Sequence, residues 1–432
     1  MGELSADEHA ELERLRREVA AQRQGRWARR GRWVGACAVL LLAAVLGSFA
    51  VVAVYLRSEV LDTDTYVQTV APLGSDPTVR TAVARRLSVE LVARSDVEGL
   101  AKQVAERLVS QGAPAQITDL VGPLVSGISS FLNNKINELM ATPRFETAWQ
   151  NINRVGHEGL VTALTGGKGQ VVSSQDYTVT IDLGELLSLA KQQLVSEGLT
   201  IFGKIPDVSI TYTLVDSTEL PKVRTYTKLL NTVGTWLPWV ALLLLLGGIL
   251  IAPNRRRGVL IGALLLGIMA ALVLAAVTVA RTYFVDNLPA SVQSPDAAAV
   301  IVTTMLRYLI ASLQTLMVAA LIIVVGAFLA GPSTVAVYFR RQVNRGIDAL
   351  AVLLRRTGDW TVRTSRMLAP AAPAVRIGIV LLAIVLLVAA NRPSVAAVLW
   401  TTVTVLGALV IFEVFVRAGS QPARTTTAPA PA

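Results

Sequence analysis

The fold is decided by residues 236–280, WLPWVALLLLLGGILIAPNRRRGVLIGALLLGIMAALVLAAVTVA, in which two apolar runs flank three consecutive arginines. A hydrocarbon core about 30 Å thick requires roughly 20 helical residues, with about 17 as the lower limit, so both runs can cross a membrane. Positive charge favours the cytoplasmic side of a membrane protein. The stretch therefore predicts two antiparallel transmembrane helices joined by a tight cytoplasmic turn at 253–258.

Similar apolar runs occur elsewhere along the chain, and we predict six transmembrane segments. These are residues 34–56, 236–252, 259–280, 308–330, 377–390 and 395–416. The first run is too long for the apolar region of a cleaved signal peptide, which favours an uncleaved signal anchor. The fifth run is short by itself, but only residues 391–394 separate it from the sixth, so these two are expected to form a helical hairpin.

The distribution of arginine and lysine predicts the orientation. If the N-terminus is cytoplasmic, the inside segments carry 21 Lys and Arg residues; they are 1–33, 253–258, 331–376 and 417–432. The short outside segments, 281–307 and 391–394, carry three. Such a bias is typical of short loops on the cytoplasmic side. We therefore expect a multi-pass protein of the plasma membrane with both termini in the cytoplasm.

Composition agrees with a membrane protein and argues against other classes. The chain is 53% hydrophobic and only 16% charged, whereas about a quarter of a soluble domain is usually charged. Its net charge of +10 is distributed beside the apolar runs and accompanies no nucleic-acid-binding module, so no nucleic acid partner is expected. The single cysteine, Cys37, lies within the first run and is expected to be a buried apolar side chain.

Residues 57–235 form the predicted extracytoplasmic domain, with 16 basic and 19 acidic residues. Its first part is expected to be helical, with clear helix starts at Asp76-Pro77 and Thr142-Pro143. Gly122-Pro123 is expected to kink or break a helix. Alternating residues then predict strands at 177–183 and 208–214, with a helix at 186–194 between them. The domain is therefore predicted to be α-rich with a small β-element.

One row of residues in this domain could face a ligand. Trp149, Asn153 and His157 are spaced four residues apart, so they share one side of a helix. The favoured interpretation is a buried tryptophan whose polar neighbours are hydrogen-bonded in the core; a ligand-binding row is the alternative. A metalloprotease motif would need a histidine at position 161, which is valine. We predict no catalytic residue, cofactor or metal site.

The cytoplasmic segments suggest surface contacts. The 331–376 loop combines apolar residues with arginines and predicts a basic amphipathic helix on anionic lipid headgroups, or a docking site for an acidic partner. Residues 1–33 predict a basic helical tail that is either a solvated lead into the anchor or a short dimerising or docking helix. Residues 417–432 predict a disordered tail.

Residues 61–67, LDTDTYV, followed by Ala71-Pro72-Leu73, Asp76-Pro77 and the row described above, resemble a group of uncharacterised multi-pass membrane proteins of actinobacterial type. That resemblance implies no activity. We expect a non-enzymatic protein of the cell envelope that uses its extracytoplasmic domain to bind an envelope protein or itself. A transporter-associated or lipid-handling protein is the alternative.

Overall fold

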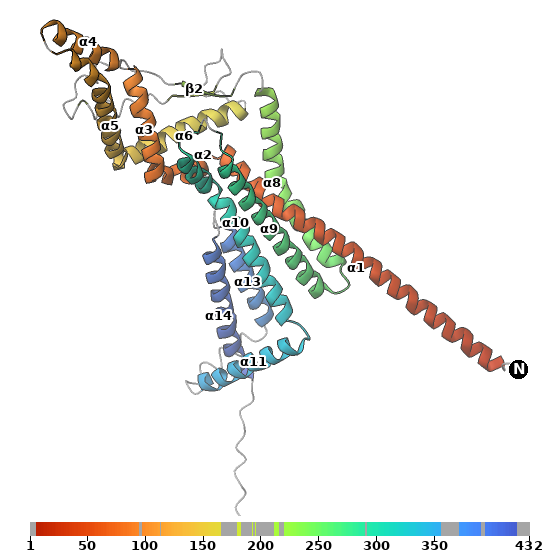
Figure 1. The fold of residues 1–432 in the computed structure, drawn as a ribbon. Coiled ribbons are helices and arrows are strands. Elements are labelled where there is room, and N and C mark those ends of the chain that lie inside the picture. The colour runs from red at the N-terminus through yellow and green to blue at the C-terminus, as the bar shows by residue number, and fades with distance from the viewer. Residues whose placement is uncertain are drawn as a thin grey trace, which may run out of the picture. The chain divides into compact units, whose positions relative to one another are not determined.

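In a computed structural model of the chain, shown in Figure 1, the described residues are 6–420 apart from ten gaps. The gaps are 95–96, 113, 166–178, 183–191, 193–194, 196–210, 216–219, 290–291, 356–370 and 390–393. The described elements are α1 Ala6–Leu61, α2 Thr63–Val70, η1 Ala71–Gly74, α3 Pro77–Arg94, α4 Val97–Ser110, η2 Ala115–Leu120, α5 Val121–Met140, α6 Pro143–Thr165, β1 Val179–Asp182, β2 Thr211–Val215, α8 Leu220–Ile251, α9 Arg255–Asp286, α10 Pro295–Leu329, α11 Thr334–Arg355, α13 Ala372–Ala389 and α14 Val395–Ser420.

The chain divides into two compact units. The first unit comprises Met1–Val51, Pro238–Ala275 and Ile310–Ala432, and the second comprises Val52–Leu237 and Ala276–Leu309. The mostly α fold predicted from the sequence is confirmed.

Among the described residues, five helices are long and apolar enough to cross a membrane. They are Arg29–Leu61, Lys222–Ile251, Arg255–Asp286, Pro295–Leu329 and Val395–Arg417. They cover the predicted spans 34–56, 236–252, 259–280, 308–330 and 395–416, apart from the last residue of the second and of the fourth. The predicted span 377–390 falls on α13, of which Ala372–Ala383 forms an apolar helix shorter than a span requires. The 377–390 span therefore stays a prediction.

Small residues allow the helices of the first unit to approach one another closely. Leu40 of α1 is fully buried, and a β-carbon added at Gly248 of α8 would lie 2.8 Å from its Cδ2 atom. A β-carbon added at Gly262 of α9 would lie 3.1 Å from the same atom. Because lipid chains are as apolar as leucine, such close packing is a main source of association between membrane helices.

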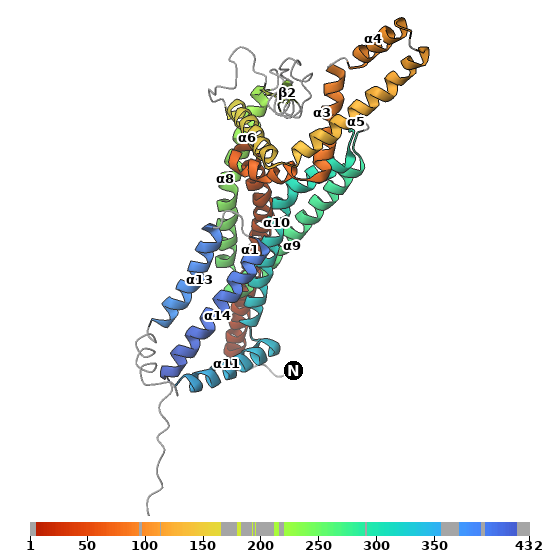
Figure 2. The same ribbon diagram turned by 90° about the vertical axis from the view of Figure 1, so that its left-hand side faces the viewer.

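Two arginines cover the C-terminal end of α10 in the first unit. Arg256 donates to the carbonyl oxygens of Ala327 and Phe328, and Arg340 of α11 donates to that of Gly331. The final carbonyls of a helix lack intrahelical donors and carry partial negative charge, so guanidinium groups stabilise this end. Figures 1 and 2 show α11 crossing the ends of α10 and α14.

The second unit begins its helices where the sequence predicts. Asp76 precedes α3, and its Oδ1 atom accepts hydrogen bonds from the backbone N–H groups of Thr78 and Val79. A core cluster joins α3, α5 and α6; its buried members are Ala84, Leu87, Ile136, Met140, Phe145 and Ile152. The expected break near Gly122-Pro123 corresponds to the change from η2 to α5 at Leu120 and Val121, and the two residues themselves lie in the first turn of α5. Proline is tolerated there because its missing N–H would have no intrahelical acceptor.

The remaining predictions for this unit concern its strands and α10. Strands β1 and β2 pair antiparallel, with Asp182 opposite Thr211. The expected helix at 186–194 lies outside the described residues, apart from residue 192. The predicted short segment 281–307 contains the end of α9 and the start of α10. In the second unit, α10 contacts α2, since Arg307 donates to the Gln68 carbonyl at 3.0 Å.

Candidate functional site

The row of Trp149, Asn153 and His157 lies on α6 in the second unit. It faces the C-terminal end of α1, helix α2 and η1, a segment covering residues 59–74 that we call the neck segment. Because α6 begins at Pro143 with its first turn anchored by Thr142, the three side chains keep the spacing expected from the sequence. The structure brings all three against this one segment.

Trp149 is held by one hydrogen bond and one close approach. Its indole Nε1 donates to the Val70 carbonyl at 3.0 Å. Gly74 lies under the ring, and a β-carbon added there would be 2.8 Å from two ring atoms. Only glycine therefore fits beneath Trp149 without a shift of the ring or of η1.

His157 is buried, with 5% of its surface exposed, and both ring nitrogens have partners. Its Nε2 lies 3.0 Å from the Glu59 carbonyl oxygen, which can only accept, so Nε2 carries a proton. In the neutral ring Nδ1 then accepts from the Thr63 hydroxyl, 3.1 Å away. Burial lowers the pKa of His157 and outweighs the hydrogen bond to Glu59, which raises it. The residue is thus suited to a neutral packing role.

Tyr66 joins the other two members of the row. Its ring stacks on His157 with centroids 4.2 Å apart, and its hydroxyl donates to the Asn153 Oδ1 at 3.4 Å. The Asn153 amide donates to the Trp149 carbonyl. Burial, together with the Glu59 carboxylate, raises the pKa of the Tyr66 hydroxyl. The row is therefore engaged in fastening α6 to the neck segment.

A cleft of about 380 Å³ lies in the second unit, beside the contact between α6 and the neck segment. It is lined by Arg57, Ser58, Leu61, Asp62, Thr63, Asp64, Arg154 and Glu158. Arg154 and Asp64 form an ion pair at 2.6 Å. The sequence does not indicate this cleft, because Asp62 and Asp64 have the pattern of ordinary helix-start residues, and Asp62 does cap α2. Within the part of the chain that the structure describes, no group of three or more His, Cys, Asp or Glu side chains could hold a metal ion.

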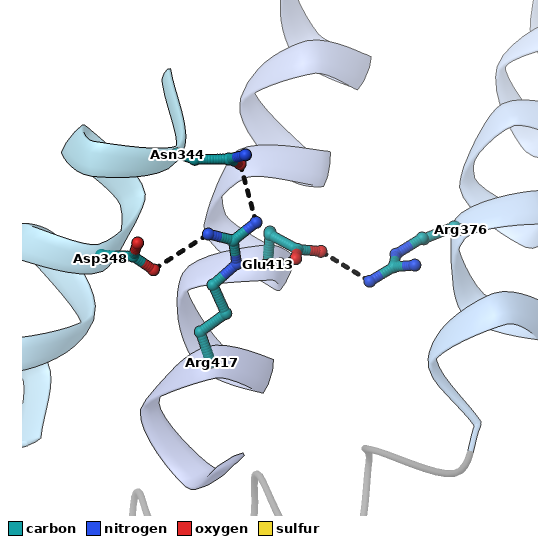
Figure 3. A network of polar contacts seen from close by, with 5 residues as sticks. All are labelled: Asn344, Asp348, Arg376, Glu413 and Arg417. Atoms are coloured by element: carbon teal, nitrogen blue, oxygen red, sulfur yellow. Dashed lines mark hydrogen bonds and ion pairs between the residues drawn. The ribbon is translucent and has the colours of Figure 1, made fainter. Parts of the chain in front are cut away.

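A second polar cluster, in the first unit, joins α11, α13 and α14 (Figure 3). Arg417 donates to Asp348 and Asn344 of α11 and to Glu413 of its own helix, at 2.8–2.9 Å. Glu413 also accepts from Arg376 of α13 at 2.7 Å. The sequence indicates only the Glu413–Arg417 pair, through its four-residue spacing. The cluster holds helices together and has no nucleophile or acid–base pair beyond these ion pairs.

No family model, curated protein or solved structure matches this chain.

Proposed function

We propose that this chain is a non-enzymatic integral protein of the plasma membrane, with its 57–235 domain outside and both termini inside. In this proposal the domain binds another envelope protein or a second copy of the chain. Five long apolar helices support the membrane placement. The arginine distribution supports the orientation.

An exposed apolar stripe on η2 and α5 carries the binding proposal. Leu120, Leu124 and Phe131 follow helical spacing, and Leu124 is 54% exposed. Another face of α5 packs into the core of the domain through Leu132 and Ile136, so the stripe is not needed for core packing. Large apolar side chains that line up on a surface are typical of interaction sites.

The polar row of α6 supports a protein partner over a small-molecule substrate. His157, Asn153 and Trp149 are occupied by contacts within the domain, so they offer no group to a ligand. The domain has 16 basic and 19 acidic residues, a balance that does not favour a polyanion. An apolar stripe on a nearly neutral domain suits a protein surface with a matching apolar patch.

Site-specific photo-crosslinking in native membranes tests this proposal. A benzophenone amino acid replaces Leu124 on the stripe, and a matched variant carries it at Ser130, an exposed polar position on another side of α5. We expect a discrete protein adduct from Leu124 and none from Ser130. Equal adducts from both positions, or none from Leu124, would contradict a binding stripe. A co-purified lipid without any protein adduct would instead favour lipid handling.

A further inference from the structure

Helix α11 is fixed at the ends of two apolar helices of the first unit. It begins at Thr334, shortly after α10 ends at Leu329. Arg340 ties it to the Gly331 carbonyl, and Asp348 ties it to Arg417 near the end of α14 (Figure 3). The two ties are eight residues apart, or about 12 Å at 1.5 Å per residue. They hold α11 across these helix ends, as Figures 1 and 2 show.

One face of α11 packs against α14, and a neighbouring face is apolar and exposed. The packed face contributes Ile347 and Ala351, which form a cluster with Val414. The exposed face, which we call the α11 stripe, is 38–64% exposed at each position; its members are Val335, Phe339, Val343, Leu350 and Leu353. Their spacing of 4, 4, 7 and 3 residues keeps them in line along the helix.

The face of α11 opposite the stripe carries Arg341 and Arg345. No carboxylate among the described residues pairs with either guanidinium; Arg345 donates only a long bond of 3.5 Å to Gln342. A helix with an apolar stripe on one side and arginines on the other is typical of helices that lie in the interface of a membrane. The arginines complement the phosphate groups of anionic lipids.

We propose that α11 is a lipid-binding helix, with its stripe in the acyl boundary of the inner leaflet and with Arg341 and Arg345 bound to anionic phospholipid headgroups. This inference rests on the membrane placement proposed above. A lipid leaflet is favoured over a soluble partner because only the four residues 330–333 separate α11 from the end of a membrane-spanning helix. Within that reach the bilayer itself supplies both an apolar layer and a layer of phosphate.

Fluorescence of the full chain in vesicles tests the proposal. In a Cys37→Ala background, a single cysteine carries an environment-sensitive dye at one of three exposed positions. These are Val343 on the stripe, Val352 on the face that carries Arg341 and Arg345, and Leu321 on α10. The vesicles contain phosphatidylcholine alone or an equal mixture with phosphatidylglycerol. We expect a blue-shifted spectrum at Val343 that shifts further with phosphatidylglycerol, and a more water-like spectrum at Val352.

Charge variants identify the ligand. The double variant Arg341→Gln/Arg345→Gln should abolish the phosphatidylglycerol-dependent shift. The control is Arg144→Gln/Arg281→Gln, which removes the same amount of charge from α6 and α9 and should keep the shift. If Leu321 reports lipid while Val343 stays water-like, the lipid-binding helix is refuted and the membrane placement stands. A water-like Leu321 refutes both. Reproduction of the shift by millimolar inorganic phosphate in phosphatidylcholine vesicles would assign a soluble anion instead.

Discussion

At the scale of single residues, His157 should make the stability of the second unit depend on pH. Burial lowers its pKa from 6.5, so the unfolded chain binds more protons than the folded chain below that pH. The contribution of the neutral His157 to the free energy of unfolding should be fully present above about pH 6.5. It should be lost as the pH decreases through the lowered pKa of the folded state. Thermal unfolding of the purified protein between pH 5 and 7.5 measures this slope.

His157→Gln keeps a donor for the Glu59 carbonyl but does not titrate, so it should flatten the slope attributable to this residue. The chain has only two histidines, which makes His9→Gln the matched control, expected to retain the slope. The same slope in His157→Gln and wild type would show that the neutral ring is not the source of the pH dependence.

The stability of the second unit should decrease when even a methyl group is added at Gly74. Gly74→Ala places a methyl group 2.8 Å from the Trp149 ring, so the ring or η1 must shift, at an expected cost of about 1–3 kcal/mol. Gly122→Ala is the control, since nothing lies within 4 Å of a β-carbon there. In a Trp149→Ala background the cost of Gly74→Ala should largely vanish. An equal loss of thermal stability in both backgrounds would rule out the contact with Trp149 as its cause.

At the scale of elements, local signals were sufficient for helix starts and insufficient for pairings. Asp76-Pro77 could be recognised because an N-cap and the backbone N–H groups that donate to it lie within three residues. The bonds from His157 to Glu59 and from Arg417 to Asp348 join residues 98 and 69 positions apart. Spacing along one helix can place a row on one face, but which segment covers that face depends on tertiary packing. For this reason the α6 row was predicted, while its partners and the neighbouring cleft were not.

The attachment of α11 to α14 should depend mainly on Arg417. Arg417→Gln removes a cation that reaches Asp348, Asn344 and Glu413, whereas Arg376→Gln removes one contact with Glu413. The side chain of Arg417 is about a quarter exposed, so solvent screening limits the expected loss to the order of 1 kcal/mol. Hydrogen exchange of α11 should quicken in Arg417→Gln and change less in Arg376→Gln. The reverse order would show that α13 contributes more to holding this end.

At the scale of the whole molecule, the number of spans determines where the C-terminus lies. Five helices of the described residues meet the length of a span, and α13 decides whether there is a further one. Five spans would put the termini on opposite sides of the membrane, and six would put them on the same side. The 21 basic residues assigned inside, against three in short outside segments, favour six. With six spans, the short helix α13 would cross the membrane together with flanking residues, or the bilayer would be locally thinner around it.

Labelling of intact cells with a membrane-impermeant thiol reagent distinguishes these topologies. In the Cys37→Ala background, single cysteines replace Gly2, Ser126 or Thr427, one in each predicted terminal or extracytoplasmic segment. With six spans we expect only Ser126→Cys to react before the cells are opened, and all three to react afterwards. Reaction of Thr427→Cys in intact cells, with Gly2→Cys protected, would mean that α13 does not span. It would also move 417–432 to the side of the membrane opposite α11, and so contradict the contact between Arg417 and Asp348 of α11.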